Sequence, residues 1–168
     1  KLSPFFSMGI AGRYIRSDLK ITSESGSKSA NSLGVDVSAF YQGQEFQFTN
    51  NNKGLFRFGI NISNVGPRLN YDVGGQKNFI PSNLKFGTGL DLILDSSNIL
   101  GIYLEFNKLL VPSPVSSYNE LGIFQGYKQP DISFLKGILT SFTDAEDGIK
   151  EEFQEITYAI GLEYNFAE

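Results

Sequence analysis

The chain has 168 residues, 40% of them hydrophobic, and a formal net charge of −4 at pH 7. This length suits a single domain, and the acidic balance without a basic patch argues against a nucleic-acid partner. The sequence contains neither cysteine nor histidine, which excludes a disulfide framework and a thiolate zinc site and removes the commonest general base. Its 18 glycines, 15 phenylalanines and 8 tyrosines favour β-structure over helix.

Six segments alternate apolar residues with small or polar ones at a period of two. In chain order they span residues 5–16, 32–41, 55–66, 84–94, 99–109 and 155–166. Successive side chains of a strand point to opposite sides, so each segment has one apolar face and one face of small and polar residues. Each is long enough to cross a bilayer as a tilted strand of about 9–11 residues. The sequence contains no run of about 18 apolar residues, so no transmembrane helix is predicted.

The apolar faces carry almost no charge in any of the six segments, and aromatic residues lie near several strand ends. These aromatic residues are Tyr14, Tyr41, Phe56, Phe106, Tyr164 and Phe166. This combination favours a sheet embedded in lipid, with an aromatic belt at the membrane interface. A soluble β-sandwich or lipocalin-like barrel is the alternative, and the absence of tryptophan counts in its favour.

The opposite faces hold glycine, alanine, serine and isolated charges of both signs, as expected for a crowded polar lumen. The lumen candidates are Arg13, Asp36, Arg57, Asn61, Lys85, Asp91, Glu105 and Glu163. We expect the charged members to pair across neighbouring strands. A polar conduit for a ligand is the alternative.

The connections between the strands also follow a pattern. The first, third and fifth, at 17–31, 67–83 and 110–154, are long, whereas the shortest, at 95–98, is one of the even ones. In an up-and-down meander the odd connections share one end of the sheet, and outer-membrane barrels place their long loops outside the cell. We therefore expect 110–154 to be a long extracellular loop. Six strands are too few to close a membrane barrel, so the chain should hold part of a larger one.

Several short segments of the sequence resemble the PorV family. They are GINISNVG at 59–66, NFIPSNLKFGTG at 78–89, FNKLLVPSP at 106–114 and EITYAIGLEY at 155–164. The resemblance implies an all-β fold, an antiparallel transmembrane β-barrel of the FadL-like kind with about fourteen strands. Residues 1–168 would then be the central segment of one barrel domain in the bacterial outer membrane.

The resemblance also implies a function without catalysis. PorV-like proteins act in the type IX protein secretion system as shuttles. They bind the C-terminal signal domain of cargo leaving the SprA/Sov-type translocon barrel, and pass the cargo to the PorU-type attachment machinery. Outer-membrane lipid and lipopolysaccharide surround them, and no cofactor, metal or catalytic residue is expected. The alternatives are a FadL-like channel for hydrophobic small molecules and a lipopolysaccharide deacylase. The sequence contains neither a histidine nor a G-x-S-x-G elbow, so it gives no support to acyl-transfer chemistry.

The long loop contains the best candidates for binding cargo or a partner. Ile132, Leu135, Ile138 and Leu139 have helical spacing after Asp131, which we expect to cap the helix. Either the rim of the barrel or a partner protein covers such a stripe. The full set of docking candidates is Phe79, Ile80, Pro81, Val111, Pro112, Ile123, Phe124, Phe134, Leu135, Ile138 and Leu139.

The acidic stretch TDAEDGIKEE at 143–152 invites comparison with a calcium loop. Its carboxylates do not alternate before Gly148 as an EF-hand requires. A solvated helix start with acidic residues in its first turn is the preferred interpretation.

Overall fold

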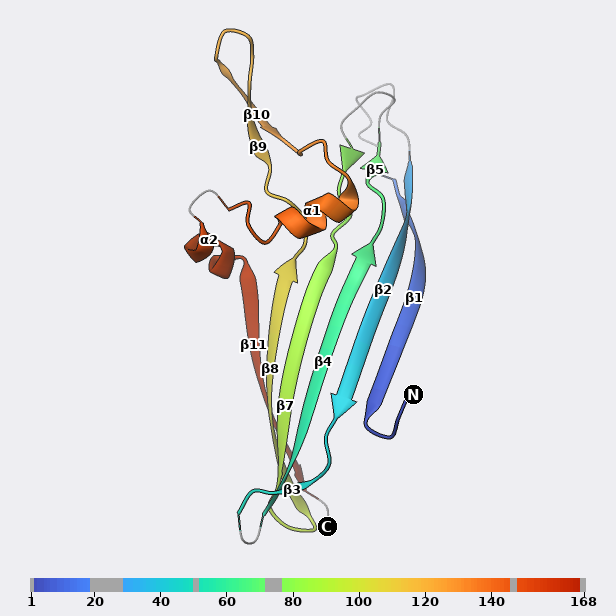
Figure 1. The fold of residues 1–168 in the computed structure, drawn as a ribbon, viewed down its shortest axis with the longest axis vertical. Helices are drawn as coiled ribbons and strands as arrows, with labels where there is room; N and C mark the ends of the chain where they lie inside the picture. Colours follow the sequence, from blue (N-terminus) through green and yellow to red (C-terminus); the bar gives the residue numbers. More distant parts are fainter. Residues whose placement is uncertain (1, 19–28, 50–51, 72–76, 146–147, 167–168) are drawn as a thin grey trace.

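An antiparallel sheet of long strands makes up most of the molecule (Figure 1). The computed structural model describes residues 2–18, 29–49, 52–71, 77–145 and 148–166. Six strands lie side by side in the order β1-β2-β4-β7-β8-β11, and every neighbouring pair is antiparallel. None of the helices in these ranges is long and apolar enough to cross a membrane.

All six strands predicted from the alternation are confirmed, and so is the all-β fold class. Their bounds are Phe6–Ser17 for β1, Ala30–Gln42 for β2, Lys53–Val65 for β4, Asn83–Ile93 for β7, Asn98–Leu109 for β8 and Ile156–Phe166 for β11. The alternation located these strands because it persists over many residues in each of them.

The connections contain shorter elements that the sequence did not predict. Two-residue strands are too short to show a period. The added strands are β3 Phe46–Gln47, β5 Leu69–Asn70, β6 Lys77–Asn78, β9 Val115–Tyr118 and β10 Phe124–Lys128. The two helices are α1 Phe134–Thr140 and α2 Ile149–Gln154.

The register keeps apolar residues of neighbouring strands on one face. Ile10 lies opposite Val37, and Phe86 lies opposite Phe106. This face is largely uncovered, as the 77% exposure of Ile10 and the 73% exposure of Leu162 show. Apolar exposure repeated over whole strands is typical of a surface that faces lipid.

One irregularity interrupts the regular pairing of β2 with β4. The register shifts between Val35 and Val37, and Asn64 has a left-handed φ of 57°. The Asn64 amide donates a 2.8 Å hydrogen bond to the Asp36 carboxylate. The bulge therefore satisfies one oxygen of a buried carboxylate on the polar face.

The two ends of the sheet differ in the size of their connections (Figure 1). The long connections lie at one end, which we call the loop end, and the short ones at the other, which we call the turn end. A small cluster of buried apolar residues lies at the loop end, where Ala30, Leu69 and Ile80 pack against Ile15 and Tyr71. The sheet itself has no such cluster among the described residues, because its apolar face is exposed.

The expected helix in the long loop forms, but its cap is not Asp131. Ser133 is the N-cap of α1, and its hydroxyl accepts a hydrogen bond from the Lys136 amide. Asp131 lies two residues earlier and pairs with Arg68 instead. The N-cap is the residue directly before the helix, and α1 begins at Phe134, so Ser133 and not Asp131 holds that position.

The acidic stretch does begin a helix, as expected. Glu151 and Glu152 lie in the first turn of α2, after Gly148. The expectation that this turn is fully solvated is wrong for Glu152, whose side chain is only 13% exposed because it binds Lys108. Glu146 and Asp147, which belong to the same stretch, lie outside the described residues.

Candidate functional site at the loop end

The connections at 67–83 and 110–154 pack together and form a cap over the loop end. Arg68 joins them: its guanidinium donates to the Pro130 carbonyl at 3.2 Å and to the Asp131 carboxylate at 2.7 Å. The same guanidinium lies over the Phe79 ring, 5.3 Å from its centroid. The hydrogen bond from Arg68 lowers the pKa of the Asp131 carboxyl below its usual value. One arginine therefore ties two connections that are distant in sequence.

Helix α1 lies directly against the Phe79 side chain. A Cβ placed on Gly137 would lie 2.7 Å from the Phe79 ring and 3.3 Å from Pro112, which is closer than side chains normally approach. Gly137 is also buried. A glycine at this position therefore allows the helix to approach the neighbouring connection closely.

A hairpin of β9 and β10 rises from the cap, away from the sheet (Figure 1). Its turn is held by the Asn119 side-chain oxygen, which accepts from the amides of Leu121 at 3.0 Å and Ile123 at 2.8 Å. Gly122 takes a φ of 72°, which glycine adopts without strain. The turn thus has a defined shape.

The side chains of this hairpin are largely apolar and exposed. The Phe124 ring meets the rings of Tyr118 and Tyr127 edge to face, at centroid distances of 5.8 and 5.3 Å. The exposed set is Val115, Tyr118, Leu121, Ile123, Phe124 and Tyr127, with Leu121 at 83%. An apolar set of this size on a protruding hairpin indicates a docking surface.

The docking candidates chosen from the sequence divide into two groups. Ile80 and Pro112 are buried, and Phe79, Val111, Phe134 and Ile138 are half-buried, so these six form the inside of the cap. The exposed candidates are Pro81, Ile123, Phe124, Leu135 and Leu139. Only this second group offers a surface to a partner, and whether it does so stays a prediction.

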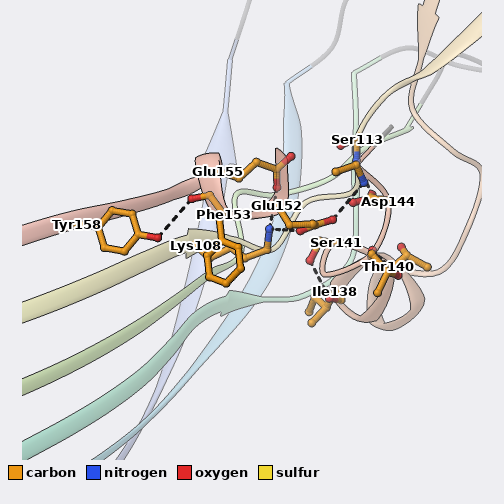
Figure 2. A network of polar contacts seen from close by, with 12 residues as sticks. Lys108, Ser113, Ile138, Thr140, Ser141, Asp144, Glu152, Phe153, Glu155 and Tyr158 are labelled. Atoms are coloured by element: carbon orange, nitrogen blue, oxygen red, sulfur yellow. Dashed lines mark hydrogen bonds and ion pairs between the residues drawn. The ribbon is translucent and has the colours of Figure 1, made fainter. Parts of the chain in front are cut away.

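A cluster that the sequence did not predict fixes the last part of the long loop (Figure 2). The Lys108 ammonium donates to Glu152 at 2.8 Å and to Glu155 at 2.7 Å. The other carboxylate oxygen of Glu152 accepts from the Ala145 amide at 3.1 Å. The hydrogen bond from Lys108, together with that amide, lowers the pKa of Glu152, although burial acts in the opposite direction. This cluster, Lys108 with Glu152 and Glu155, is called the lysine clamp below.

A second set of contacts holds the segment before α2. The Ser113 amide donates to the Asp144 carboxylate at 2.7 Å, and the Ser141 hydroxyl donates to the Ile138 carbonyl at 2.8 Å (Figure 2). Ser141 is 1% exposed, so this hydroxyl needs its internal acceptor. The chain between α1 and α2 is therefore anchored to the beginning of the same loop.

The polar face of the sheet shows the expected cross-strand pairing. Arg13 pairs with Asp36 at 2.5 Å, Arg57 with Asp91 at 2.6 Å and Lys85 with Glu105 at 3.1 Å. The remaining two lumen candidates, Asn61 and Glu163, lie on this same face by register. These pairs neutralise charge within the face, and the position of the face inside a lumen stays a prediction.

Tyr103 adds a contact to this face that the sequence did not single out. Its hydroxyl donates to Asp91 at 2.8 Å, and its ring lies over the backbone of Gly89 and Gly101. A Cβ at either glycine would come within 2.5 Å of that side chain. Gly89 lies opposite Tyr103 on β7, and Gly101 precedes it by two residues on β8, so small residues around one tyrosine were the available signal.

Comparison with protein families identifies a match. The family model described as "PorV: Type IX secretion system protein PorV" matches residues 1–116, which is more than half of the chain. The matched part contains five of the six long strands, the 67–83 connection of the cap and the first residues of the 110–154 connection. No curated protein matches the chain.

Proposed function

The chain belongs to the PorV family of type IX secretion system proteins, and from that premise we propose that it is a non-catalytic adaptor that holds secreted cargo at the cell surface. The protein is an outer-membrane component of this secretion system. In this role it would bind the C-terminal signal domain of cargo that arrives from the SprA/Sov-type translocon barrel. It would then pass the cargo to the PorU-type attachment machinery.

The orientation follows from the lengths of the connections. Outer-membrane strands are joined by short turns on the periplasmic side and by longer loops on the outside. We therefore assign the loop end to the cell exterior. This orientation presents the cap and its hairpin to cargo that has already crossed the membrane.

The exposed hairpin of β9 and β10 is the observation that carries the proposal. An isolated two-stranded hairpin has little intrinsic stability in water, and this one also leaves Tyr118, Leu121 and Tyr127 at least 61% exposed. Such a surface becomes stable when a partner covers it. Its free strand edges offer backbone groups to an incoming strand as well.

The cap below the hairpin supports the same role. Arg68 ties the middle of the long loop to the neighbouring connection, and the lysine clamp fixes its last part against β8. A preorganised loop loses less conformational entropy when it binds a partner. The hairpin is thus presented from a fixed base rather than from a free loop.

A ligand conduit through the polar face is the second candidate. A hollow of about 510 Å³ lies on the sheet, with Arg57, Tyr103 and several glycines in its lining. The internal pairing of the charges supports a structural role for this face instead, because paired groups offer less to a solute. Conductance of the full-length protein in planar bilayers distinguishes the two: single-channel currents would favour the conduit.

The adaptor proposal is tested with a triple variant of the full-length protein, Tyr118→Ser, Leu121→Ser and Tyr127→Ser. We expect the barrel to assemble normally and the cargo recovered with the affinity-purified variant to fall about tenfold, as expected when a few apolar anchors are lost. Secretion into the medium should fall in parallel.

The matched control removes apolar groups at the opposite end of the sheet. Phe46 and Phe48 are 43% and 52% exposed near the turn end, and the double change Phe46→Ser with Phe48→Ser should leave cargo recovery unchanged. Wild-type recovery of cargo with the assembled hairpin variant would contradict the proposal.

A further inference from the structure

The long loop does more than cap the sheet end, because its last part folds down over the apolar face. Lys108 follows Leu104 and Phe106 on that face of β8, and Ile102 and Leu104 are 37% and 39% exposed. Lys108 itself is only 6% exposed. Burial thus increases along one row of one strand toward the loop end, which shows where the loop crosses onto the outward face.

The lysine clamp makes this crossing possible. A lysine on a lipid-facing row needs partners for its ammonium group, and Glu152 and Glu155 reach it from the segment around α2. The ammonium also lies 5.8 Å from the centroid of the Phe142 ring. The clamp therefore holds Phe142 and α2 a short distance off the sheet.

The space that remains between the loop and the sheet is a pocket of about 310 Å³. Its apolar lining comes from Leu84, Phe86, Phe106 and Ile156 of the sheet and from Phe142 and Phe153 of the loop, and the clamp residues Lys108 and Glu152 line it as well, with Asn107. Phe86 and Phe153 are 37% and 60% exposed, so the pocket is open to its surroundings. Its volume is at the lower end of the range seen for small-molecule sites.

The pocket opens at a row of aromatic residues that crosses four strands. The ring centroids lie 5.2 Å apart for Phe58 and Phe86, 6.1 Å for Phe86 and Phe106, and 5.5 Å for Phe106 and Tyr158. Aromatic rows of this kind mark the boundary between headgroups and hydrocarbon. The pocket therefore lies at the boundary, and the exposed apolar face continues from it toward the turn end.

We propose that this pocket binds one acyl chain of an outer-membrane lipid. Continuity with the lipid-facing surface selects this occupant, because a lipid beside Phe86 and Phe106 can enter without leaving the membrane. Acyl chains gain free energy with each methylene group they bury. The clamp does not select a phosphate headgroup, since two carboxylates already surround its single ammonium.

This site is separate from the adaptor role and from the hollow on the polar face. It lies on the outward side of the sheet, whereas the charged pairs lie on the other side. Loss of lipid binding would therefore leave the cargo proposal standing, and the converse also holds.

For the test, the full-length protein is delipidated in detergent and then mixed with a defined lipid. Native mass spectrometry measures how much lipid the protein retains. The probes are dipalmitoyl phosphatidylethanolamine and dipalmitoyl phosphatidylglycerol, with glycerophosphate as a headgroup without chains. We expect both lipids to be retained equally and glycerophosphate not to compete. The variant Ile156→Trp fills the pocket and should retain about tenfold less lipid, the loss expected from excluding about two methylene groups.

Leu162→Trp is the matched control, because Leu162 lies on the same face of the same strand, outside the pocket. It should retain lipid as the wild type does. Phe153→Glu is a second variant at an exposed position of the loop, for use if Ile156→Trp does not assemble, and it should also lose the lipid. Equal retention by the wild type and an assembled pocket variant would overturn the proposal, as would competition by glycerophosphate.

Discussion

The protein uses ion pairs on both faces of one sheet, and the two faces give them different surroundings. On the polar face, Lys85 and Glu105 are 44% and 46% exposed and join neighbouring strands that backbone hydrogen bonds already hold. On the apolar face, the Lys108 side chain is 7% exposed and joins strand β8 to the segment around α2 through side-chain contacts. An ion pair therefore adds little to strands that are already paired on the polar face, whereas on the apolar face it holds the loop to the sheet.

Breaking the lysine clamp should have the largest effect. Lys108→Met keeps the length of the side chain and removes its charge, so Glu152 is left in a mostly buried position without its ammonium partner. We expect the free energy of unfolding to fall by about 3 kcal/mol, the usual cost of removing one member of a buried pair. Urea unfolding of the full-length protein in detergent measures this value.

Detachment of α2 provides a second measurement on the same variant. Limited proteolysis should cut between 141 and 155 much faster in Lys108→Met than in the wild type. A second variant that also carries Glu152→Gln and Glu155→Gln should recover part of the lost stability, because it leaves no buried charge unpaired. Unchanged proteolysis of Lys108→Met would mean that the clamp does not hold the loop.

Acid should weaken the same contact through Glu152. The pKa of Glu152 is lowered in the folded protein by the hydrogen bond from Lys108. Its contribution to stability is therefore complete above the unfolded pKa of about 4.3 and is lost as the pH falls through the lower folded value. Proteolysis within 141–155 should increase as the pH falls below about 4, whereas Glu152→Gln should show a smaller change over that range.

The matched change on the polar face should have the smallest effect. Lys85→Met makes the same substitution as Lys108→Met, but both members of its pair are exposed. We expect a loss below about 1 kcal/mol, which is typical of exposed pairs, when unfolding is measured as for Lys108→Met. If the two variants were equally destabilised, the contrast between the faces would not hold.

The six long strands and their faces could be predicted from the sequence because alternation is a local property. Each strand repeats it over many residues, and pairing with a neighbour does not change which side a residue takes. The cross-strand charge pairs on the polar face followed from the same pattern. The cap could be predicted only in part, since the hydrophobic spacing located α1 but not Ser133 as its N-cap.

The clamp and the pocket beside it could not be predicted from local pattern alone. Lys108 and Glu152 are 44 residues apart, and the acidic stretch around Glu152 has the composition of a solvated helix start. The available signal was that Lys108 continues the apolar row of β8, where a charge requires a partner. Nothing in the sequence identified that partner.

The sequence by itself determined the strands, the division of their residues between two faces, and the family, since these depend on residue order along single strands. Only the tertiary structure decided that the long loop returns to the apolar face, that Lys108 is buried there, and that the hairpin remains exposed. The physical reason is that a strand's faces are fixed by backbone geometry, whereas the path of a loop is fixed by contacts between residues far apart in the chain.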